Sequence, residues 1–526
     1  MAEVRNILFI MADQLRWDYL SCYGHPHLKT RNIDKLAAKG VRFDRAFVQS
    51  PVCGPSRASF YTGRTVFSHG STWNRVPLPI GEYTIGDYLR PAGMRCAVVG
   101  KTHMTPDPDL SGRFGLTPKT EIGMLLGEPG FEPYERDDGI HPDKMVRAKP
   151  ELTYNAWLRS KGYGGDNPWH EYANAAEGPD GEILSGWSLR NSKLPARVAE
   201  EHSETAYMTD RALDFINETG DQPWLLHLSY IKPHWPYMAP SPYHDMFGPA
   251  HILPVNRSEE ERETGHPVFR AFMEMGVSQT FSEPGVRETV LPAYMGLIHQ
   301  IDDHLGRLFE ALEERGLMDN TMIVFTSDHG DYLGDHWMGE KELFHDCSMR
   351  VPLIIYDPRA QADAARGHVC QDFVEAIDLL PTFLDVMEME VPSHRLEGLS
   401  LRPLLEGLRP DNWRDHAFSE IDYGFYRAVE TLDIPLEQAR GYAFRTERWK
   451  YVYFKGMRAQ LFDLEADPDE LIDLGDDPEL ADVCQDLQRR LLERLTNRRN
   501  RVGLPDSAVA PMRPHNSKSG VVIGQW

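Results

Sequence analysis

Four short apolar runs, each followed by polar or charged residues, constrain the fold of this chain more than any other feature. They are residues 6–11 (NILFIM), 96–100 (CAVVG), 224–230 (WLLHLSY) and 322–327 (MIVFTS). Each run is brief, is bounded by glycine, proline or polar residues, and lacks polar–apolar alternation. This pattern is typical of strands buried on both faces. It predicts a sheet that other elements cover on both sides.

A helical pattern separates the third run from the fourth. Between residues 294 and 315, apolar side chains recur at helical spacing on one face, and Gly316 closes the segment. Strands that alternate with helices favour a largely parallel α/β sheet. We therefore predict an α/β fold with a large, mostly parallel central sheet flanked by helices. Ligands should bind beyond the carboxyl ends of its strands.

The chain divides into segments that differ in composition and in the elements they predict. Residues 1–405 hold the predicted sheet, and within them residues 104–195 are rich in proline, glycine and acidic residues. We interpret residues 104–195 as an irregular insertion that forms walls of a substrate pocket. Residues 406–500 combine three short antiparallel strands with a helix after Asp477-Pro478, which predicts a smaller C-terminal α+β domain. Residues 501–526 are predicted to be a tail, either a disordered end or an oligomerisation arm.

Composition excludes several classes of protein. The 526 residues carry a formal net charge of −24, so the chain should repel nucleic acid and acidic membrane surfaces. No apolar run is long enough to span a bilayer and no secretory signal pattern is present, so we expect no membrane partner and a cytoplasmic location. A small anionic substrate would need a locally positive pocket.

The cysteines point to one reactive position. The chain has six, which are dispersed without a CxxC pair, so no disulfide framework is predicted. One of them lies in the segment Cys53-Gly54-Pro55-Ser56-Arg57. If Pro55 opens a helix, Cys53 lies at the positive end of that helix and Arg57 lies on its first turn. A sulfur, a helix N-terminus and a guanidinium together predict an anion-binding site.

This segment also resembles the Cys-x-Pro-Ser-Arg signature of the type I sulfatases, and the resemblance covers most of the chain. Asp13 after the first strand and Asp328-His329 after a later strand complete the set in the family's order. A single aspartate after a strand is more often a turn residue, but the combined set argues against that interpretation. The resemblance implies an alkaline-phosphatase-like fold and a Cys53 oxidised to formylglycine by a formylglycine-generating enzyme. It also implies one metal ion held by Asp13, residue 53, Asp328 and His329.

Two positions depart from the commonest sulfatase pattern. Gln14 stands where that pattern has a second aspartate, and His329 stands where it often has asparagine. The Asp-Gln and Asp-His pairs are similar to those of bacterial phosphonate monoester hydrolases and choline sulfatases. Mixed oxygen and nitrogen ligands suit a transition metal such as manganese, whereas all-oxygen sites suit calcium. We therefore favour Mn²⁺, with Ca²⁺ as the alternative, and leave open whether Gln14 contacts the metal or only the substrate.

Further candidate residues rest on the resemblance. It implies that Lys101 and His103, in a Gly-Lys-x-His motif, anchor the sulfate and remove a proton from formylglycine. The presence of this pair favours sulfate esters. The resemblance also implies that His234 and Lys341 act beside the leaving-group oxygen, and that Asn74 is a pocket amide. Taken singly, each of these residues would be interpreted as an ordinary strand-end, loop or surface side chain.

The predicted activity is hydrolysis of sulfate monoesters, as in an arylsulfatase, with phosphonate monoesters and phosphodiesters as side substrates. The metal and Arg57 would make the hydrated residue 53 nucleophilic. The alternative is a phosphonate monoester hydrolase with the reverse preference. Two other classes stay open, a two-metal phosphatase with a serine or threonine nucleophile and a non-catalytic scaffold in which Cys53 remains a thiol. We expect a small anionic ester as substrate and a homo-oligomer, either dimer or tetramer.

Overall fold

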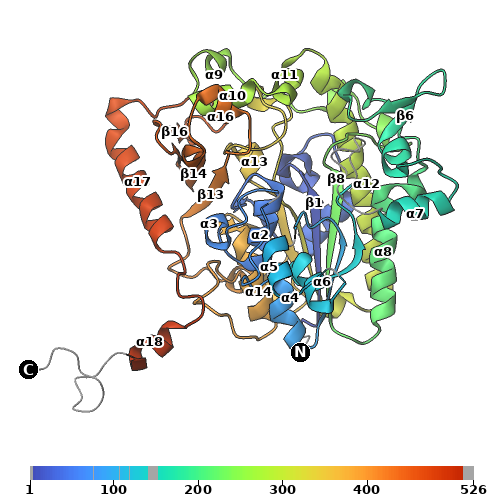
Figure 1. The fold of residues 1–526 in the computed structure, drawn as a ribbon, viewed down its shortest axis with the longest axis horizontal. Coiled ribbons are helices and arrows are strands. Elements are labelled where there is room, and N and C mark those ends of the chain that lie inside the picture. Colours follow the sequence, from blue (N-terminus) through green and yellow to red (C-terminus); the bar gives the residue numbers. More distant parts are fainter. Residues whose placement is uncertain (1–3, 75, 106, 118, 140–151, 513–526) are drawn as a thin grey trace, which may run out of the picture.

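The computed structural model describes residues 4–74, 76–105, 107–117, 119–139 and 152–512 (Figure 1). Within these residues a central sheet of eight strands has the order β11-β2-β10-β9-β1-β8-β4-β5. The strands are β1 (Asn6–Asp13), β2 (Val41–Phe43), β4 (Arg95–Gly100), β5 (Glu132–Arg136), β8 (Trp224–Pro233), β9 (Thr321–Ser327), β10 (Leu353–Tyr356) and β11 (Val369–Cys370). Of these described strands, β10 alone runs antiparallel to its neighbours. The predicted mostly parallel sheet is confirmed, and the four apolar runs form β1, β4, β8 and β9.

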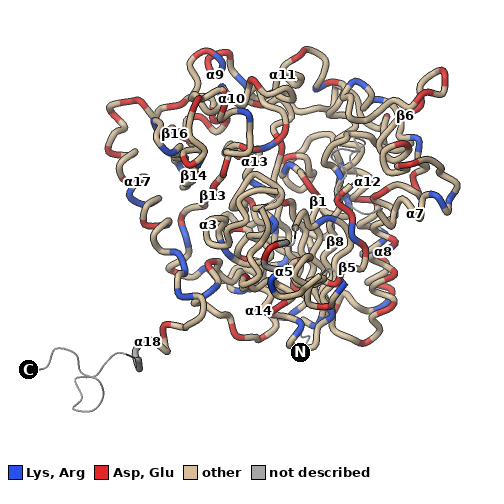
Figure 2. Tube along the Cα trace, in the orientation of Figure 1, with Lys and Arg blue, Asp and Glu red and all other residues tan. Residues whose placement is uncertain are grey.

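Charge is spread over the outer helices and loops. Acidic and basic residues are interspersed in the view of Figure 2, and acidic residues predominate in the sequence as a whole. Among the described residues, no helix is both long enough and apolar enough to cross a membrane.

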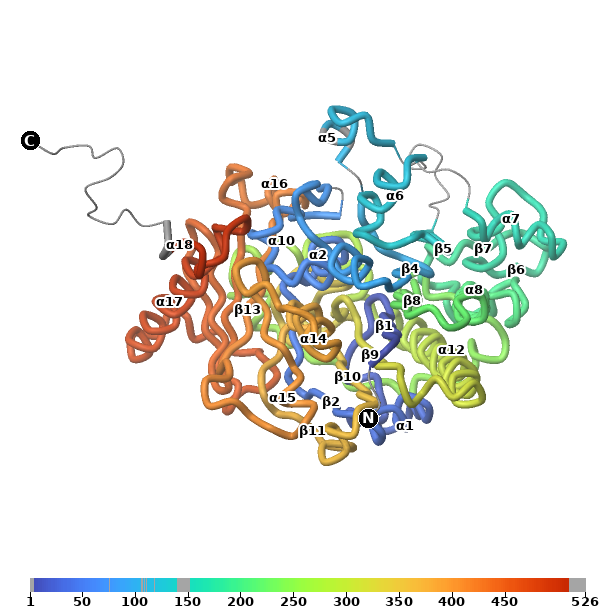
Figure 3. The backbone as a smooth tube through the Cα atoms, turned by 90° about the horizontal axis from the view of Figure 1, so that it is seen from below, coloured from blue at the N-terminus to red at the C-terminus, as the bar shows by residue number. Residues whose placement is uncertain are grey.

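Both faces of the central sheet are covered, as the unbroken apolar runs predict (Figure 3). Leu8 and Ile10 of β1 belong to one buried cluster, with side chains from α1 (Arg31–Lys39), α8 (Glu204–Thr219) and α12 (Val286–Glu314). Phe9 and Met11 point to the other face and join side chains from α2 (Cys53–Thr62), α4 (Ile85–Leu89) and α14 (Leu379–Val386). Successive residues of a strand face opposite sides, so a strand between two layers must be apolar throughout.

The longest of these helices begins earlier than the sequence pattern indicates. The predicted helix starts at residue 294, whereas α12 starts at Val286 and contains Pro292 in its interior. A proline is usually expected to end or kink a helix, because it lacks an N–H donor and clashes with the preceding turn. Burial of this segment offsets that local preference, since Val290, Leu291 and Ala293 are all buried.

A second, antiparallel sheet follows in the C-terminal part of the chain. Its strands are β13 (His416–Asp422), β14 (Arg440–Thr446), β15 (Trp449–Phe454) and β16 (Ala459–Asp463). One face packs against α17 (Ala481–Thr496), where Phe444 and Leu461 meet Leu487 and Leu491. The predicted smaller α+β unit with a short antiparallel sheet is confirmed. β13 was not predicted, because buried polar residues such as Glu420 interrupt its apolar pattern.

Residues 104–195 contain more regular structure than their composition indicates. β5 extends the central sheet beside β4, and β6 (Ala175–Glu177) pairs with β7 (Ile183–Ser185). β5 has the sequence EPYER, which shows no strand pattern. This edge strand is only partly buried, so polar residues are tolerated along it. Residues 140–151 of the predicted insertion lie outside the described residues. The boundaries at residues 405 and 500 stay predictions.

The described part of the segment predicted to be a tail, residues 501–512, contains one helix. α18 (Asp506–Met512) lies within residues 501–526, and residues 513–526 lie outside the described part of the chain. The predicted oligomerisation arm stays a prediction.

Candidate active site

Segments far apart in the sequence meet at the carboxyl edge of the central sheet. Asp13 ends β1, Lys101 follows β4, His234 follows β8 and Asp328 follows β9, while α2 begins at Cys53. All five residues are buried. β9, β1, β8 and β4 are consecutive, parallel neighbours, so their carboxyl ends lie at one edge. The convergence predicted from the strand ends is present.

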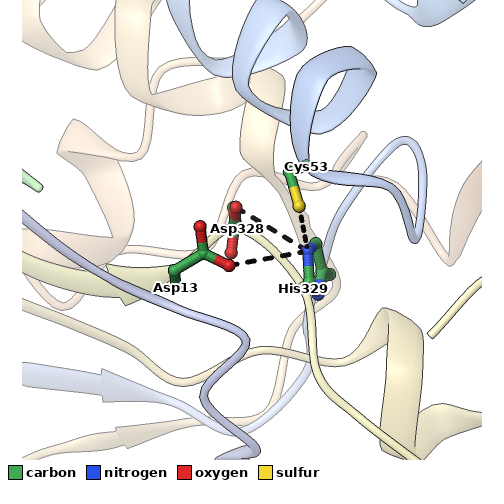
Figure 4. A group of neighbouring side chains, drawn as sticks. All are labelled: Asp13, Cys53, Asp328 and His329. Atoms are coloured by element: carbon green, nitrogen blue, oxygen red, sulfur yellow. Dashed lines mark hydrogen bonds and ion pairs between the residues drawn. The ribbon is translucent and has the colours of Figure 1, made fainter. Parts of the chain in front are cut away.

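Asp13, Cys53, Asp328 and His329 surround one small volume (Figure 4). One ligand atom from each of the four residues lies within 4.8 Å of the others. His329 Nε2 is 3.0 Å from Cys53 Sγ, 3.7 Å from Asp328 Oδ2 and 3.9 Å from Asp13 Oδ1. His329 Nδ1 donates to the Gly330 carbonyl at 2.8 Å, so Nε2 is the nitrogen available to the cluster. The structure therefore brings the four predicted ligands together.

This cluster fits a divalent cation. Among the described residues, Asp13 Oδ1 is buried without a hydrogen-bond partner. A carboxylate oxygen in the interior is costly unless a donor or a cation reaches it. Burial alone would raise the pKa of Asp13, but Lys101 lowers it below its usual range and the carboxylate stays ionised. Two carboxylates and an imidazole form the mixed donor set that suits a transition metal such as Mn²⁺.

Arg57 ties the two carboxylates together from α2. Its Nε donates to Asp328 Oδ2 at 2.8 Å, and its Nη2 donates to Asp13 Oδ2 at 3.1 Å. Its Nη1 donates to the Lys101 carbonyl at 2.7 Å and to Ser229 Oγ at 2.8 Å. Burial alone would lower the pKa of Arg57, but the two aspartates raise it well above its usual value. The guanidinium is thus a fixed, fully charged part of the site.

α2 begins at Cys53, and not at Pro55 as predicted. Val52 is extended and precedes the helix, and Pro55 lies in the first turn, where a missing N–H donor breaks no helical hydrogen bond. Cys53 still lies at the positive end of the helix. Burial alone would raise the pKa of the Cys53 thiol, but Lys341 and Lys101 lower it well below its usual value. Position 53 therefore favours a negatively charged side chain.

Lys101 and His103 approach this position from the end of β4. Lys101 Nζ lies 2.5 Å from Asp13 Oδ2. His103 has a φ of 57°, its backbone N–H donates to Asp138 Oδ1 at 3.1 Å, and its side chain lies close enough to Cys53 for the thiol to influence its pKa. Burial and the charge of Lys101 lower the pKa of His103. Its imidazole is therefore neutral at neutral pH and able to accept a proton.

Gln14, Lys341 and His234 form a second network. Lys341 Nζ donates to Gln14 Oε1 at 2.9 Å and to His234 Nε2 at 3.4 Å. His234 Nδ1 donates to the Trp235 carbonyl at 2.7 Å, so its Nε2 carries the lone pair. Burial lowers the pKa of His234 to about 3. Burial alone would lower the pKa of Lys341 too, but the neighbouring Cys53 raises it, so the lysine holds the proton of this pair.

Two residues that sequence reasoning missed hold this arrangement. Asp331 Oδ2 accepts hydrogen bonds from Gln14 Nε2 and, at 2.8 Å, from the Tyr237 hydroxyl. Ser229 contacts Arg57 from within β8. Both had a usable signal, since Asp331 lies in the loop after β9 and Ser229 is a polar residue inside an apolar run.

Asn74 supports the start of α2. Its Oδ1 accepts a hydrogen bond from the Gly54 N–H at 2.7 Å. A Cβ at Gly54 would lie 2.9 Å from Asn74 Cα, so the two backbones approach closely. The predicted contact of Asn74 with substrate stays a prediction.

A second group of metal-ligand type, formed by Glu261, His336 and His345, lies outside this site. The rings of His336 and His345 stack 3.6 Å apart at an angle of 7°. Imidazole lone pairs lie in the ring plane, so parallel rings do not direct two nitrogens at one ion. His336 Nδ1 instead pairs with Glu261 Oε1 at 2.6 Å. We interpret this group as a structural contact.

Comparisons with known proteins agree with this geometry. The model of the family described as Sulfatase matches residues 5–389, and that described as N-sulphoglucosamine sulphohydrolase, C-terminal, matches residues 334–497. The multifunctional alkaline phosphatase superfamily protein PehA of Trinickia caryophylli is 32% identical over 515 residues, which cover 93% of this chain and 94% of that protein. An arylsulfatase of Clostridium perfringens is 29% identical over 508 residues, covering 94% of this chain and 95% of the relative.

Among solved structures, the phosphonate monoester hydrolase of Agrobacterium radiobacter superimposes with a TM-score of 0.80 and 30% identity. The match covers 94% of this chain and 95% of that chain. The family match spans most of the chain, includes the four clustered ligands, and agrees with the sheet topology. This chain therefore belongs to the sulfatase family, within the alkaline phosphatase superfamily of ester hydrolases.

Proposed function

We propose that the protein hydrolyses sulfate monoesters, as an arylsulfatase does, with a formylglycine nucleophile formed from Cys53. We further propose that it accepts phosphonate monoesters and phosphodiesters. The observation that carries this proposal is the position of Cys53 Sγ, which is buried at a helix start, 3.0 Å from His329 Nε2, near Lys101 and Lys341. The names of the relatives support ester hydrolysis of this kind.

The proposal includes one divalent metal ion, Mn²⁺ in preference to Ca²⁺. Asp13, residue 53, Asp328 and His329 would hold it. When bound, such an ion stabilises negative charge on the reacting oxygens and lowers the pKa of a neighbouring hydroxyl.

The first step forms a covalent ester on residue 53. One hydroxyl of the hydrated formylglycine passes its proton to Asp328 and attacks the sulfur in line, while the bond from sulfur to the alcohol oxygen breaks. Lys341, which holds its proton in the network with Gln14, gives that proton to the departing alcohol oxygen. Arg57 and Lys101 stabilise the charge on the remaining sulfate oxygens.

The second step releases sulfate. His103, whose imidazole is neutral, takes the proton of the second hydroxyl of residue 53. The carbon–oxygen bond to sulfate breaks, the aldehyde is restored, and a water molecule adds to it to regenerate the diol. An unmodified thiol has no second hydroxyl and could not complete this step. His234 accepts a hydrogen bond from Lys341 and so orients the ammonium group.

Intact-protein mass spectrometry tests the nucleophile. Conversion of Cys53 to formylglycine lowers the mass by about 18 Da, and we expect activity to scale with the converted fraction after co-expression with a formylglycine-generating enzyme. Cys53→Ala should abolish turnover, whereas Cys484→Ala on α17 should not. Near-full activity of Cys53→Ala would refute the scheme. An unchanged mass would favour a scaffold, and two metal ions per chain would favour a two-metal phosphatase.

A second candidate is a phosphonate monoester hydrolase and phosphodiesterase with sulfatase side activity. Similarity to the phosphonate monoester hydrolase of Agrobacterium radiobacter, with a TM-score of 0.80, favours it. The values of kcat/KM for 4-nitrophenyl sulfate and 4-nitrophenyl phenylphosphonate discriminate, because the two esters share one leaving group. A higher value for the sulfate supports our first proposal, and a higher value for the phosphonate supports the second.

The proposal also covers the location, the oligomeric state and the maturation of the enzyme. We propose a cytoplasmic homo-oligomer, dimer or tetramer, that depends on a formylglycine-generating enzyme for maturation. Analytical ultracentrifugation of the converted protein would give its subunit number, and a monomer would contradict this part.

A further inference from the structure

A cavity of about 410 Å³ opens beside the leaving-group side of the site. Its walls come from residues 186–189 of the predicted insertion, residues 235–237 after β8, α11 (Gly276–Ser282) and Glu340. Sites for small molecules usually have volumes of roughly 300–1,000 Å³. Trp235 directly follows His234, and Glu340 directly precedes Lys341. The cavity is therefore lined by the immediate chain neighbours of the two residues that we place beside the departing oxygen.

The walls of this cavity are largely aromatic. The rings of Trp187 and Trp235 meet edge to face, with centroids 4.8 Å apart and an angle of 65°. Tyr237 and Phe281 add two further aromatic side chains. Lys341 Nζ lies 5.7 Å from the centre of the Trp235 ring, so the aromatic wall reaches the proton donor itself. Such walls bind flat apolar groups through buried area and edge-to-face contacts.

The charge of the cavity differs from that of the reaction centre. Among the described residues that line it, Glu340 is the one charged side chain, and its Oε2 lies 3.6 Å from Lys341 Nζ. A carboxylate among aromatic rings attracts a cationic group and repels an anionic one. The reaction centre, by contrast, presents the cations Arg57 and Lys101 to the anionic end of an ester.

We infer, on the basis of the proposed function, that this cavity binds the alcohol part of the ester. The substrate is then a monoanionic ester of a flat, aromatic alcohol that is neutral or positively charged. Its acidic group sits against the reaction centre and its ring against Trp187 and Trp235. Esters of alcohols that carry a carboxylate, such as acidic sugars, are poor substrates.

Replacing one wall tests the preference for aromatic alcohols. We compare phenyl sulfate with 2,2,2-trifluoroethyl sulfate, a small ester that leaves most of the cavity unfilled, as the ratio of their kcat/KM values. Trp187→Ala should lower this ratio by about tenfold, because the phenyl ring loses a wall. The matched control is Phe67→Ala, since Phe67 is exposed and packs under Arg498 on another part of the surface. An unchanged ratio in Trp187→Ala would overturn the inference.

Changing the one carboxylate tests the preference for charge. We compare phenyl sulfates that carry a trimethylammonium or a carboxylate group in the para position. The wild-type enzyme should prefer the cationic ester, and Glu340→Gln, which keeps the shape and removes the charge, should reduce that preference by about tenfold. An equal preference in both enzymes would contradict the role of Glu340. If phosphonates are the better substrates, the same alcohols are tested as methylphosphonate esters.

Phenol binding separates a failure of this inference from a failure of the proposed function. If the wild-type protein hydrolyses none of these esters, the proposed function fails. Calorimetry with phenol then still measures whether the cavity takes an aromatic alcohol. Binding to the wild-type protein that weakens in Trp187→Ala supports the inference, and binding that is absent or equal in the two proteins overturns it.

Discussion

Arg57 shows how single residues allow several charges to be buried in this site. Its guanidinium, like the carboxylates of Asp13 and Asp328, has no exposed side-chain surface, and it donates to both aspartates and to two further oxygens. Breaking a buried ion pair costs about 3–5 kcal/mol, because it leaves a charge in the interior without a partner. The planar fork of arginine matches two acceptors at once, which an ammonium group cannot do.

Arg57→Lys should therefore both destabilise and inactivate the enzyme. The variant keeps the positive charge but loses charge-assisted hydrogen bonds, so we expect the free energy of unfolding to fall by about 2–3 kcal/mol. Loss of charge stabilisation should lower kcat by about a hundredfold. Chemical denaturation and steady-state kinetics measure the two effects. Arg211→Lys, at a partly exposed pair with Asp214, is the control, and equal stability of the two variants would contradict the argument.

Asp331 is predicted to be a positioning residue. Both of its carboxylate oxygens accept hydrogen bonds, Oδ1 from the Leu333 N–H and Oδ2 from Gln14 Nε2 and the Tyr237 hydroxyl. In Asp331→Asn the new NH2 group would therefore face a donor in either orientation. If Gln14 then turns its amide, its nitrogen faces the ammonium of Lys341, and the proton donor moves. We expect kcat/KM to fall by about tenfold or more, with a change in its dependence on leaving-group pKa. Tyr237→Phe removes one hydrogen bond without turning Gln14, so a similar loss there would contradict this account.

The residues at the strand ends were predicted from the sequence, whereas their supporting residues Asp331 and Ser229 were not, although each had a weak signal. Asp13, Lys101 and Asp328 follow apolar runs, and parallel topology alone brings such positions together. His234 and Lys341 were found through the family resemblance, because each lies in a loop whose path depends on tertiary contacts. The aromatic cavity was not predicted, since Trp187 meets Trp235 only through the fold of residues 104–195.

Among the elements, β4 and β8 lie very close together at the edge of the sheet where the site is formed. Gly100 at the end of β4 has a φ of +107°, and a Cβ there would clash with the Ser229 carbonyl oxygen. Ser229 contacts Arg57, and Lys101 directly follows the last residue of β4. A glycine is required here for space as well as for backbone conformation.

Gly100→Ala should consequently damage both the sheet and the site. We expect a loss of about 3 kcal/mol or more in the free energy of unfolding, from strain and steric clash together, and loss of activity. Gly93→Ala is a matched control, because Gly93 also has a positive φ but has open space around its Cβ position. It should cost about 1 kcal/mol and leave kcat unchanged. Urea unfolding and kinetics give both quantities, and equal losses in the two variants would argue against the close approach.

Elements with an unbroken apolar run were predictable from the sequence, and elements whose burial depends on their neighbours in space were not. β1 and β9 are buried along their whole length, and each contains an unbroken apolar run, so a single run of sequence is enough to identify each. β5 is a partly buried edge strand and β13 contains buried polar side chains, so neither has a strand pattern of its own. The early start of α12 depends on packing around Pro292, which local sequence does not report.

The whole molecule buries histidines deep in its core, and this links its stability to pH. His227 in β8 donates from Nδ1 to the Phe9 carbonyl and hydrogen-bonds the Tyr61 hydroxyl through Nε2. His69 accepts the Ser71 N–H at Nδ1, so a second proton would displace that hydrogen bond. Burial lowers the pKa of both histidines to about 3. Each is therefore neutral in the folded protein over the range in which an exposed histidine becomes charged.

Acidification should for this reason destabilise the fold well above the pKa of most carboxylates. Below about pH 6.5 the unfolded chain binds protons at these histidines that the folded chain does not. The free energy of unfolding therefore decreases as the pH is lowered. Each histidine contributes a slope of roughly 1.4 kcal/mol per pH unit between pH 6.5 and 3. In His227→Gln the slope, measured by urea unfolding from pH 6 to 4, should be shallower by that amount. His368→Gln, at an exposed histidine, should keep the wild-type slope. If His227→Gln loses stability equally at every pH, then burial of this neutral imidazole is not the source of the pH dependence.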